Sequence, residues 1–515
     1  MKTSKLLISK ILLLILLIMT YWLTFIDKIG LHADEAWFGL EGIKFLNSGI
    51  LRLRGMNNYT GILQSLLDSV MFKYFGVGVI QMRLGGILCN SIALMILVWF
   101  LGRRVNRMAP LFFLLFFAQS ALYLCFSKVA WEIYSFNFLF VTVSAISLYE
   151  SVNRDGRISH FLRFIFLITA FLGVYNHIVF SGFLLSIYIG FLMWFMFAEI
   201  KPDRIKARVL SLLFLSLVNA VLIFIMMRFY IDEVWSKLGQ LLFLFPLILF
   251  IIECLLFQTI TQVLNVTTEL LSKIKINIYI KKGVPFLFLL PFIRYQAITV
   301  FQVFSQEIIL IRVFSYELNY FLKILLLIAA SGILLYVAYS LIKDVLKRSG
   351  ALWAYVLLAY MAILSFYTHG HSIRYFLTST LLIFLYASYK LSLENRAVRN
   401  YFILGIALNM ILIQSTLWKI NLEKDRSVKA TMFKIDNFRE TSAHFLNFSR
   451  VLDFIHQHKI GELETKQDYF IGKVFNFYKN EYPVINDYKN RMKIDYDYEV
   501  KGNGFKIDTT FANKQ

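Results

Sequence analysis

Long apolar runs alternate with short polar connections along most of this chain. The first run follows the basic N-terminus MKTSK and extends from Leu6 to Ile26, a length that spans a bilayer and predicts a retained anchor. Later runs have similar lengths, so the pattern predicts about thirteen membrane-spanning helices, with the stretch from 259 to 320 the most ambiguous. These later runs lie at roughly 80–101, 109–127, 133–150, 161–176, 178–199, 209–230, 240–258, 284–300, 321–342, 351–368, 373–391 and 400–417.

Two parts of the chain are more polar. Residues 27–79 form a long first loop, and its second half, GILQSLLDSVMFKYFG, has the spacing of a helix lying in the membrane interface. From Lys419 the hydropathy falls: NFRETSAHFLNFSRVLDFIHQHKIG predicts an amphipathic helix, and DYFIGKVFNFYKNEYPVI predicts short strands and turns. We therefore predict an all-α polytopic membrane domain over residues 1–418 and a small soluble α/β domain over residues 419–515.

Composition and charge agree with a membrane protein. Hydrophobic residues make up 58% of the chain, above the roughly 45–50% of soluble domains. The net charge of +21 would suggest nucleic-acid binding in a soluble protein, but here the basic residues occupy every second connection, which places those connections in the cytoplasm. The N-terminus is then cytoplasmic, and the first loop and the C-terminal domain are external. The three cysteines lie in apolar runs and predict no disulfide framework.

The first external loop carries an adjacent acidic pair in the motif LHADEAWFGLEG. Asp34 and Glu35 follow the first spanning helix and lie next to His32. A carboxylate at a membrane surface can accept a proton from a hydroxyl nucleophile. The alternative is a solvated loop whose acidic residues have no chemical role.

Two further polar groups lie in short external connections. In SKVAWE, Glu132 falls at or inside the bilayer edge, where an unpaired charge is costly. Its partner could be Lys128 at i−4 on the same helix face, a residue of the first loop, or a metal ion. In the tight turn YNH, His177 is a candidate for substrate binding, although such a histidine is more often a hydrogen-bonded interfacial residue.

The fourth external group is THGHSIRYFL, which opens a spanning helix. His369, His371, Arg374 and Tyr375 at a helix N-terminus form a candidate anion site suited to phosphate. Arg374 could instead anchor the helix at the interface beside Tyr375. A carboxylate base, a phosphate site and apolar walls at one membrane face together indicate group transfer from a lipid phosphate to a hydroxyl acceptor.

These motifs resemble the GT-C glycosyltransferases, in particular the branch with protein O-mannosyltransferases, lipid A aminoarabinose transferases and sugar transferases of lipopolysaccharide. The resemblance is carried by HADEAWFGLEG, FGVGVIQMRLGGILCNSIALMILVWFLGRRV, SKVAWEIYSFNFLF and HSIRYFLTSTLLIFL, and it covers roughly residues 1 to 200 and 350 to 420. The chain departs from the family in having NNYTGILQS where a Pro-Pro element is common, and in having Glu132 where aspartate is frequent.

The resemblance implies a polyprenyl-phosphate-linked monosaccharide donor, inversion at the sugar carbon and a hydroxyl acceptor in the cell envelope. Asp34 would be the general base, with Glu35 as its neighbour or substitute. Glu132 would be a second acidic site, with a divalent metal as an open option. Phosphate binding would fall to Arg374, His371 and His369, and substrate contacts to His32, Lys128, His177 and Tyr375.

Two other classes of polytopic membrane protein remain as alternatives. A flippase or transporter of lipid-linked sugars usually has two related halves with charges near the bilayer midplane, whereas the charges here gather at one face. An O-antigen ligase or polymerase would use a lipid-diphosphate donor and a large late external loop. The chain has no nucleotide-binding glycine motif. The short basic loops favour a bacterial inner membrane, with the external side periplasmic.

Overall fold

The computed structural model describes most of the membrane domain and part of the C-terminal domain. The described residues are 2–197 apart from 28–30, 51–53, 58 and 155; scattered positions between 215 and 266; and 278–294, 303–306, 309–310, 318–347, 351–366, 373–422, 445–446, 449–465, 472–497 and 504–510.

The membrane domain is built from helices alone. Within the described residues, eight helices are long and apolar enough to cross a membrane, so the chain is an integral membrane protein and the all-α prediction is confirmed. They are α1 (Lys2–Thr24), α4 (Val79–Arg104), α7 (Glu132–Val152), α8 (Gly156–Asn176), α9 (Val179–Phe197), α17 (Tyr320–Leu346), α19 (Phe376–Leu393) and α20 (Arg396–Leu422). Shorter apolar helices are α5 (Ala109–Ala118) and α18 (Leu352–Leu364). The predicted run at 209–230 falls largely outside the described residues, and the run at 240–258 is described at only about half of its positions.

Aromatic and aliphatic side chains fill the space between these helices. α4 packs against α5 and α7, α7 against α8, and α19 against α5. α9 and α18 approach so closely that a Cβ atom on Gly190 would lie 2.6 Å from the backbone of Val356. Every residue of α5 is buried, which places it at the centre of the bundle.

One predicted spanning helix is wrong. The run at 109–127 forms two short helices, α5 and α6 (Ala121–Phe126), separated at Gln119 and Ser120. The Ser120 side chain caps α6 by accepting the Tyr123 N–H, and the side-chain oxygen of Gln306 accepts the Leu122 N–H at 3.0 Å. These acceptors replace the backbone carbonyls that a continuous helix would have supplied.

The predicted span at 284–300 also differs. Its described part is a 3-10 helix, η1 (Val284–Leu289), followed by the short α14 (Leu290–Arg294), and α13 (Ile278–Gly283) precedes them. None of these is long enough to cross a membrane.

Two helices of the first loop pack against each other. α2 (Ala33–Ser48) carries the acidic pair, and α3 (Leu63–Phe75) is the helix predicted in the second half of the loop. Gly42 permits their close approach, because a Cβ atom there would lie 2.9 Å from the carbonyl oxygen of Ser65. Before α2, β1 (Leu31–His32) pairs antiparallel with β2 (Phe445–Leu446) of the C-terminal region.

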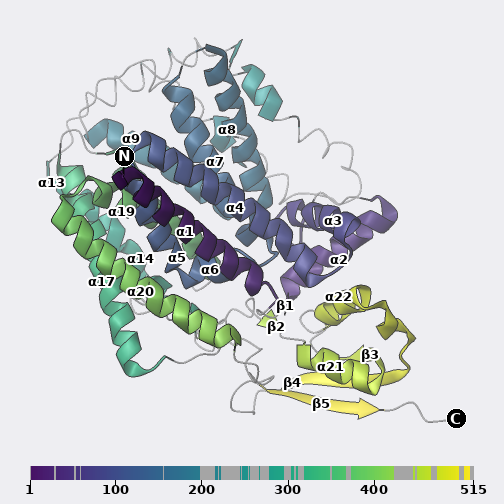
Figure 1. Cartoon of the computed structure of the whole chain (residues 1–515). Coiled ribbons are helices and arrows are strands. Elements are labelled where there is room, and N and C mark those ends of the chain that lie inside the picture. The colour runs from purple at the N-terminus through teal and green to yellow at the C-terminus, as the bar shows by residue number, and fades with distance from the viewer. Residues whose placement is uncertain are drawn as a thin grey trace.

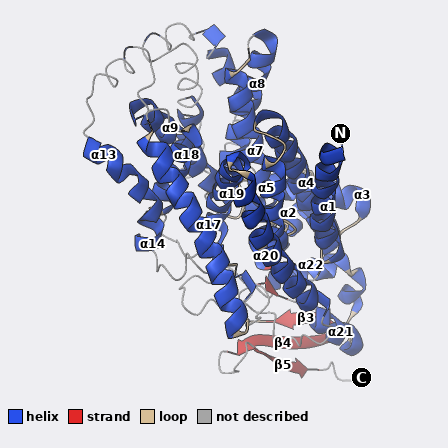
Figure 2. Cartoon of the chain, turned by 60° about the vertical axis from the view of Figure 1, so that its left-hand side comes forward, coloured by secondary structure: helices blue, strands red, loops and turns tan. Residues whose placement is uncertain are grey.

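The C-terminal region forms a small α/β domain at one end of the helical bundle, close to α2 and α3 (Figures 1 and 2). Its sheet has the order β3-β4-β5, with β3 parallel to β4 and β4 antiparallel to β5. The strands are β3 (Ile460–Glu464), β4 (Asn490–Asp497) and β5 (Gly504–Thr510), and the helices are α21 (Ser449–His458), α22 (Lys473–Glu481) and the 3-10 helix η5 (Pro483–Asp487).

Two local predictions for this domain need correction. The segment predicted as strands and turns contains α22, because its buried residues have helical spacing: Val474, Phe475, Phe477 and Tyr478. The predicted amphipathic helix is present only as α21 and is followed by a strand, while residues 437–444 lie outside the described part. The last spanning helix, α20, ends at Leu422.

Candidate active site

The acidic pair begins helix α2. His32 is the N-cap residue: its Nδ1 accepts the Asp34 N–H at 2.9 Å, and the Glu35 carboxylate accepts the His32 N–H at 3.0 Å. This reciprocal capping box satisfies backbone donors of the first turn, and the helix dipole favours negative charge there. The capping box therefore fixes the backbone on which both carboxylates are carried.

Glu35 is bound on all sides by protein groups. Arg83 of α4 donates to its two oxygens at 2.9 and 2.8 Å, and the Ala130 N–H donates to one of them at 2.8 Å. Arg83 also donates to the carbonyl of Ile26 at the end of the first spanning segment. Both side chains of this ion pair are completely buried. The pair thus ties α2 to α4, to the end of the first span and to the turn before α7.

Asp34 lies beside this network. Its side chain is 6% exposed, and its Oδ2 lies 3.7 Å from His32 Nδ1. Of the two adjacent acids, Asp34 is the one whose charge acts on Glu132 and Arg374.

Glu132 is the first residue of α7 and follows Trp131, which is extended. Of the three partners considered for Glu132, Lys128 on the same helix face is excluded, because the helix begins only at Glu132. Lys128 instead donates to the Phe25 carbonyl, and its ammonium lies 4.8 Å from the centre of the Tyr21 ring. The buried Glu132 carboxylate faces His177, with Oε1 4.0 Å from Nε2.

His177 sits in the turn between α8 and α9. Its Nδ1 accepts the Val179 N–H at 3.1 Å and so caps α9. The backbone forms an antiparallel bridge with Thr60, and the Tyr59 ring lies 5.4 Å from the imidazole. Burial, and then the nearby Arg374, lower the pKa of His177 well below its usual value, so the imidazole is neutral.

Arg374 lies in the 3-10 turn η2 (Ile373–Tyr375) directly before α19. The guanidinium is 5.2 Å from the centre of the Trp131 ring and 5.4 Å from that of Tyr375. His32 stacks on the same indole, with ring centres 4.7 Å apart. Two predicted phosphate ligands, His369 and His371, lie outside the described residues.

The charged and ionisable side chains of the site thus lie at or just before the N-terminal ends of α2, α7, α9 and α19. Among the described residues, five buried polar atoms here have no hydrogen-bond partner: Trp131 Nε1, Glu132 Oε2, Asn176 Oδ1, His177 Nε2 and Arg374 Nε. Buried polar groups are normally paired, because an unpaired one costs free energy. A concentration of them around charged side chains is typical of a site that a polar ligand completes.

Sequence reasoning missed several members of this site. Arg83 was part of a helix motif, yet a charged residue inside an apolar run is itself a signal of a buried partner. Asn176 was not missed, because it belongs to the external turn YNH. It donates to the backbone carbonyl of Glu132 at 2.8 Å and holds α8 against α7. Trp131 and Tyr59 carried no signal, because aromatic residues are abundant throughout the chain.

The donor set does not fit a metal centre. In the part of the chain that the structure describes, no three side chains of His, Cys, Asp or Glu converge as a metal ion would require. Glu132 and Asp34 interact electrostatically, and the two nearby histidines are held by backbone groups: His32 Nδ1 accepts the Asp34 N–H, and His177 Nδ1 accepts the Val179 N–H.

The C-terminal domain contacts the helices that carry the site. Phe477 of α22 packs on Gly39 of α2, where a Cβ atom would lie 2.5 Å from the phenyl ring. Glu481 at the end of α22 accepts the N–H of Val79, the first residue of α4, at 3.4 Å. Burial raises the pKa of Glu481 to about 7, although the Val79 N–H and Arg83 act in the opposite direction.

We expect this contact to make stability depend on pH. Because the pKa of Glu481 is higher in the folded protein than its usual 4.5, protonation favours folding, and this contribution is lost as the pH rises through about 7. Glu481→Gln removes the charge and keeps an oxygen for Val79. Its unfolding midpoint should exceed that of the wild type by about 1–3 °C at pH 8 and match it near pH 4.5, measured by intrinsic fluorescence. An equal difference at both pH values would contradict this.

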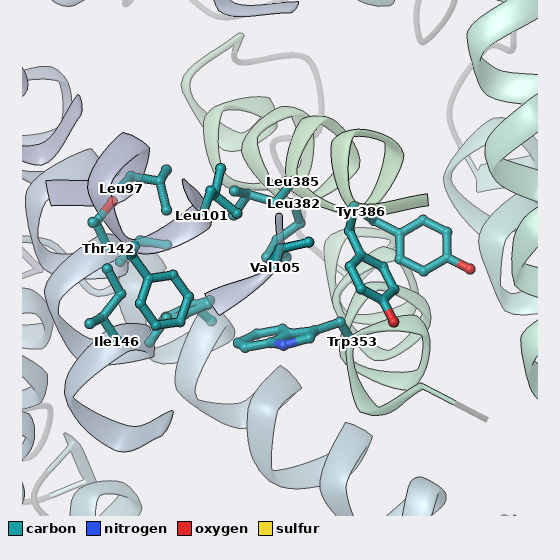
Figure 3. Close-up of a pocket in the computed structure, with 14 residues that line it drawn as sticks. Leu97, Leu101, Val105, Thr142, Ile146, Trp353, Leu382, Leu385 and Tyr386 are labelled. Carbon is teal, nitrogen blue, oxygen red and sulfur yellow. The ribbon is translucent and has the colours of Figure 1, made fainter. Parts of the chain in front are cut away.

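An apolar cavity of about 90 Å³ lies away from the site (Figure 3). Its walls come from the later parts of α4, α7 and α19 and from the beginning of α18, including Leu101, Ile146, Trp353 and Tyr386. Since the site residues lie at the first residues of α7 and α19, this cavity belongs to the other end of the bundle.

Two solved structures are similar to this chain. No family model matches the chain, and no curated protein matches it. The crystal structure of ArnT from Cupriavidus metallidurans bound to undecaprenyl phosphate is similar over 94% of this chain and 92% of that chain, with a TM-score of 0.46 and 10% identity. The apo structure of the same protein gives a TM-score of 0.40 over the same shares.

Proposed function

We propose that this protein is a membrane glycosyltransferase that moves a monosaccharide from a polyprenyl-phosphate donor to a hydroxyl acceptor. The observation that carries the proposal is a buried cation with an unpartnered N–H, Arg374, close to a buried carboxylate, Asp34, at one end of a bundle of apolar helices. A cation binds the phosphate of the donor, a carboxylate receives the proton of the acceptor, and apolar helices accommodate a lipid chain.

The reaction is a single displacement. Asp34 accepts the proton of the acceptor hydroxyl while the hydroxyl oxygen forms a bond to the anomeric carbon of the sugar. The bond between that carbon and the phosphate oxygen breaks at the same time, and its electron pair stays on the phosphate. Arg374 stabilises this developing charge through its planar N–H donors, in a buried site where the interaction is stronger than in water. One displacement inverts the configuration of the sugar.

Glu35 has a different role from Asp34 in this proposal. Because Arg83 and two backbone N–H groups already occupy its oxygens, Glu35 is a positioning residue that fixes the first turn of α2. The basic connections at the opposite ends of the helices support a site on the external side, which would be the periplasm in a bacterial inner membrane. The acceptor is a hydroxyl of a cell-envelope glycan, lipid or protein.

Substitution of Arg374 tests the proposal. Purified wild type should release polyprenyl phosphate from at least one donor in a panel of short-chain polyprenyl-phosphate monosaccharides. Arg374→Gln should lower kcat/KM about 100-fold or more, and Arg374→Lys should retain part of the activity, because it keeps the charge without the planar fork. The matched control is Arg103→Gln. Arg103 is exposed and stacks on Trp99 in the last turn of α4, at the opposite end of that helix from Arg83.

Two results would contradict the proposal. The first is no release from any donor by folded wild type, in which case transport of lipid-linked sugar across vesicles becomes the next assay. The second is equal activity of wild type and Arg374→Gln, which would move the phosphate site elsewhere.

A further inference from the structure

Glu132 and His177 face each other across a gap. Their side chains are 1% and 3% exposed, and Glu132 Oε1 lies 4.0 Å from His177 Nε2. That distance is too long for a hydrogen bond, for which the two atoms should approach to about 2.7–3.2 Å. Glu132 Oε2 and His177 Nε2 both have no hydrogen-bond partner among the described residues. Two complementary polar groups are therefore held close together without satisfying each other.

The donor and acceptor roles at this gap follow from the surroundings of His177. Because Nδ1 accepts the Val179 N–H, it carries no proton, and the proton of the neutral imidazole is on Nε2. The gap is thus lined by an N–H donor on one side and by a carboxyl oxygen on the other. An oxygen atom about 2.85 Å from both atoms would subtend an angle of about 90° between them, close to the geometry of a hydroxyl that accepts one hydrogen bond and donates another.

The backbone on both sides of the gap is fixed. The Asn176 side chain donates to the carbonyl of Glu132 at 2.8 Å, and the Ile178 N–H donates to the carbonyl of Tyr59 at 3.0 Å. The two groups therefore cannot close the gap by a simple shift of either turn. The charges of Asp34 and Arg374 act on Glu132, so the gap adjoins the groups assigned to the base and to the phosphate.

We propose that Glu132 and His177 form a binding slot for one alcohol hydroxyl of a carbohydrate, with Nε2 donating to its oxygen and the Glu132 carboxyl accepting its hydrogen. This hydroxyl belongs either to the transferred sugar or to the acceptor, both of which lie between Asp34 and Arg374 during transfer. The assignment rests on the proposed function. Glu132 and His177 take no part in the displacement itself, and the slot gives them a role in binding the carbohydrate.

Two substitutions of His177 separate the slot from the helix cap. In His177→Asn, the amide oxygen replaces Nδ1 as acceptor for the Val179 N–H, and nothing replaces Nε2. In His177→Gln, the longer side chain places its amide N–H near the position of Nε2. We expect His177→Asn to lower the rate of the product that depends on the slot about tenfold or more, which is the effect of losing one hydrogen bond to a bound group. His177→Gln should recover part of the lost rate.

The assay uses a donor that wild type accepts, with water alone and with added glycerol as an acceptor alcohol. If the slot binds the acceptor hydroxyl, His177→Asn lowers the yield of glyceryl glycoside more than that of free sugar. If the slot binds the transferred sugar, the yields of glyceryl glycoside and of free sugar fall together. The monodeoxy donor that lacks the bound hydroxyl is then cleaved at the same rate by wild type and by His177→Asn. Unchanged rates of both products, with Asp34→Asn inactive, would overturn the slot and leave the proposed function standing.

A binding measurement keeps the inference falsifiable if wild type cleaves no donor. Methyl glycosides at tens of millimolar should raise the unfolding midpoint of wild type and of His177→Gln, and should not raise that of His177→Asn. Equal shifts in all three proteins, or none in any, would overturn the slot. Absence of cleavage together with the expected pattern of shifts would contradict the transferase alone.

Discussion

Asp34→Asn should lower the release of polyprenyl phosphate at least ~100-fold, because general base catalysis typically contributes 10²–10⁴-fold. The amide has nearly the same shape as the carboxylate, but it cannot accept the proton of the acceptor hydroxyl. The Asp34 N–H bond to His32 and the Glu35 ion pair are unaffected, so the unfolding midpoint should stay within about 1–2 °C of the wild type. Initial rates with a short-chain donor and thermal unfolding check the two expectations.

Asp68→Asn is the matched control. Asp68 lies in α3, is completely buried and accepts a hydrogen bond from Gln64 at 2.8 Å. Burial raises its pKa well above the usual value, which favours the neutral carboxyl that asparagine mimics closely. We expect this variant to keep wild-type activity. Equal losses in the two variants would indicate a general effect of acidic substitutions, and an active Asp34→Asn would remove Asp34 from the role of base.

Breaking the ion pair between Glu35 and Arg83 should have the largest effect on stability. Removal of one partner from a fully buried pair costs about 3–5 kcal/mol, because the remaining charge is left without compensation. In Glu35→Gln, Arg83 keeps its charge, and the bonds that anchor α2 to the Ala130 N–H and to α4 are weakened. We expect the unfolding midpoint to fall by roughly 5–10 °C.

The double variant Glu35→Gln with Arg83→Met distinguishes pairing from simple loss of packing. If the two charges depend on each other, the double variant is less destabilised than the sum of the single variants, with a coupling of about 0.5–3 kcal/mol. Strict additivity would contradict the pairing. Activity should fall in both single variants, since the first turn of α2 also carries Asp34.

The sequence allowed prediction of the class of protein and of most charged members of the site. Asp34, Glu132, His177 and Arg374 each stand next to an apolar run, where a charged or ionisable residue is conspicuous. Their convergence could not be predicted, because it depends on the packing of α2, α7, α9 and α19. The different roles of Asp34 and Glu35 could not be predicted either, because they depend on the ion pair that Glu35 forms with Arg83, 48 residues away.

Local errors have local causes. Lys128 and Glu132 have the spacing of one helical turn, but the extended Trp131 starts the helix after Lys128. In the 109–127 run, hydropathy does not reveal the cap that Ser120 provides or the hydrogen bond that Ser120 donates to Gln306, 186 residues away. In α22, the apolar pairs at 474–475 and 477–478 fit a helix better than a strand, and the alternation between them was misleading.

A density map of the purified protein in lipid nanodiscs with added polyprenyl phosphate tests the central claim most directly. We predict that the phosphate lies within about 3 Å of the guanidinium of Arg374, on the side of the site that holds Asp34 and Glu132, with the lipid chain running along the spanning helices. Phosphate density at the basic connections near the opposite ends of α4 and α19, with Arg374 uncontacted, would contradict the assignment of this site to donor binding.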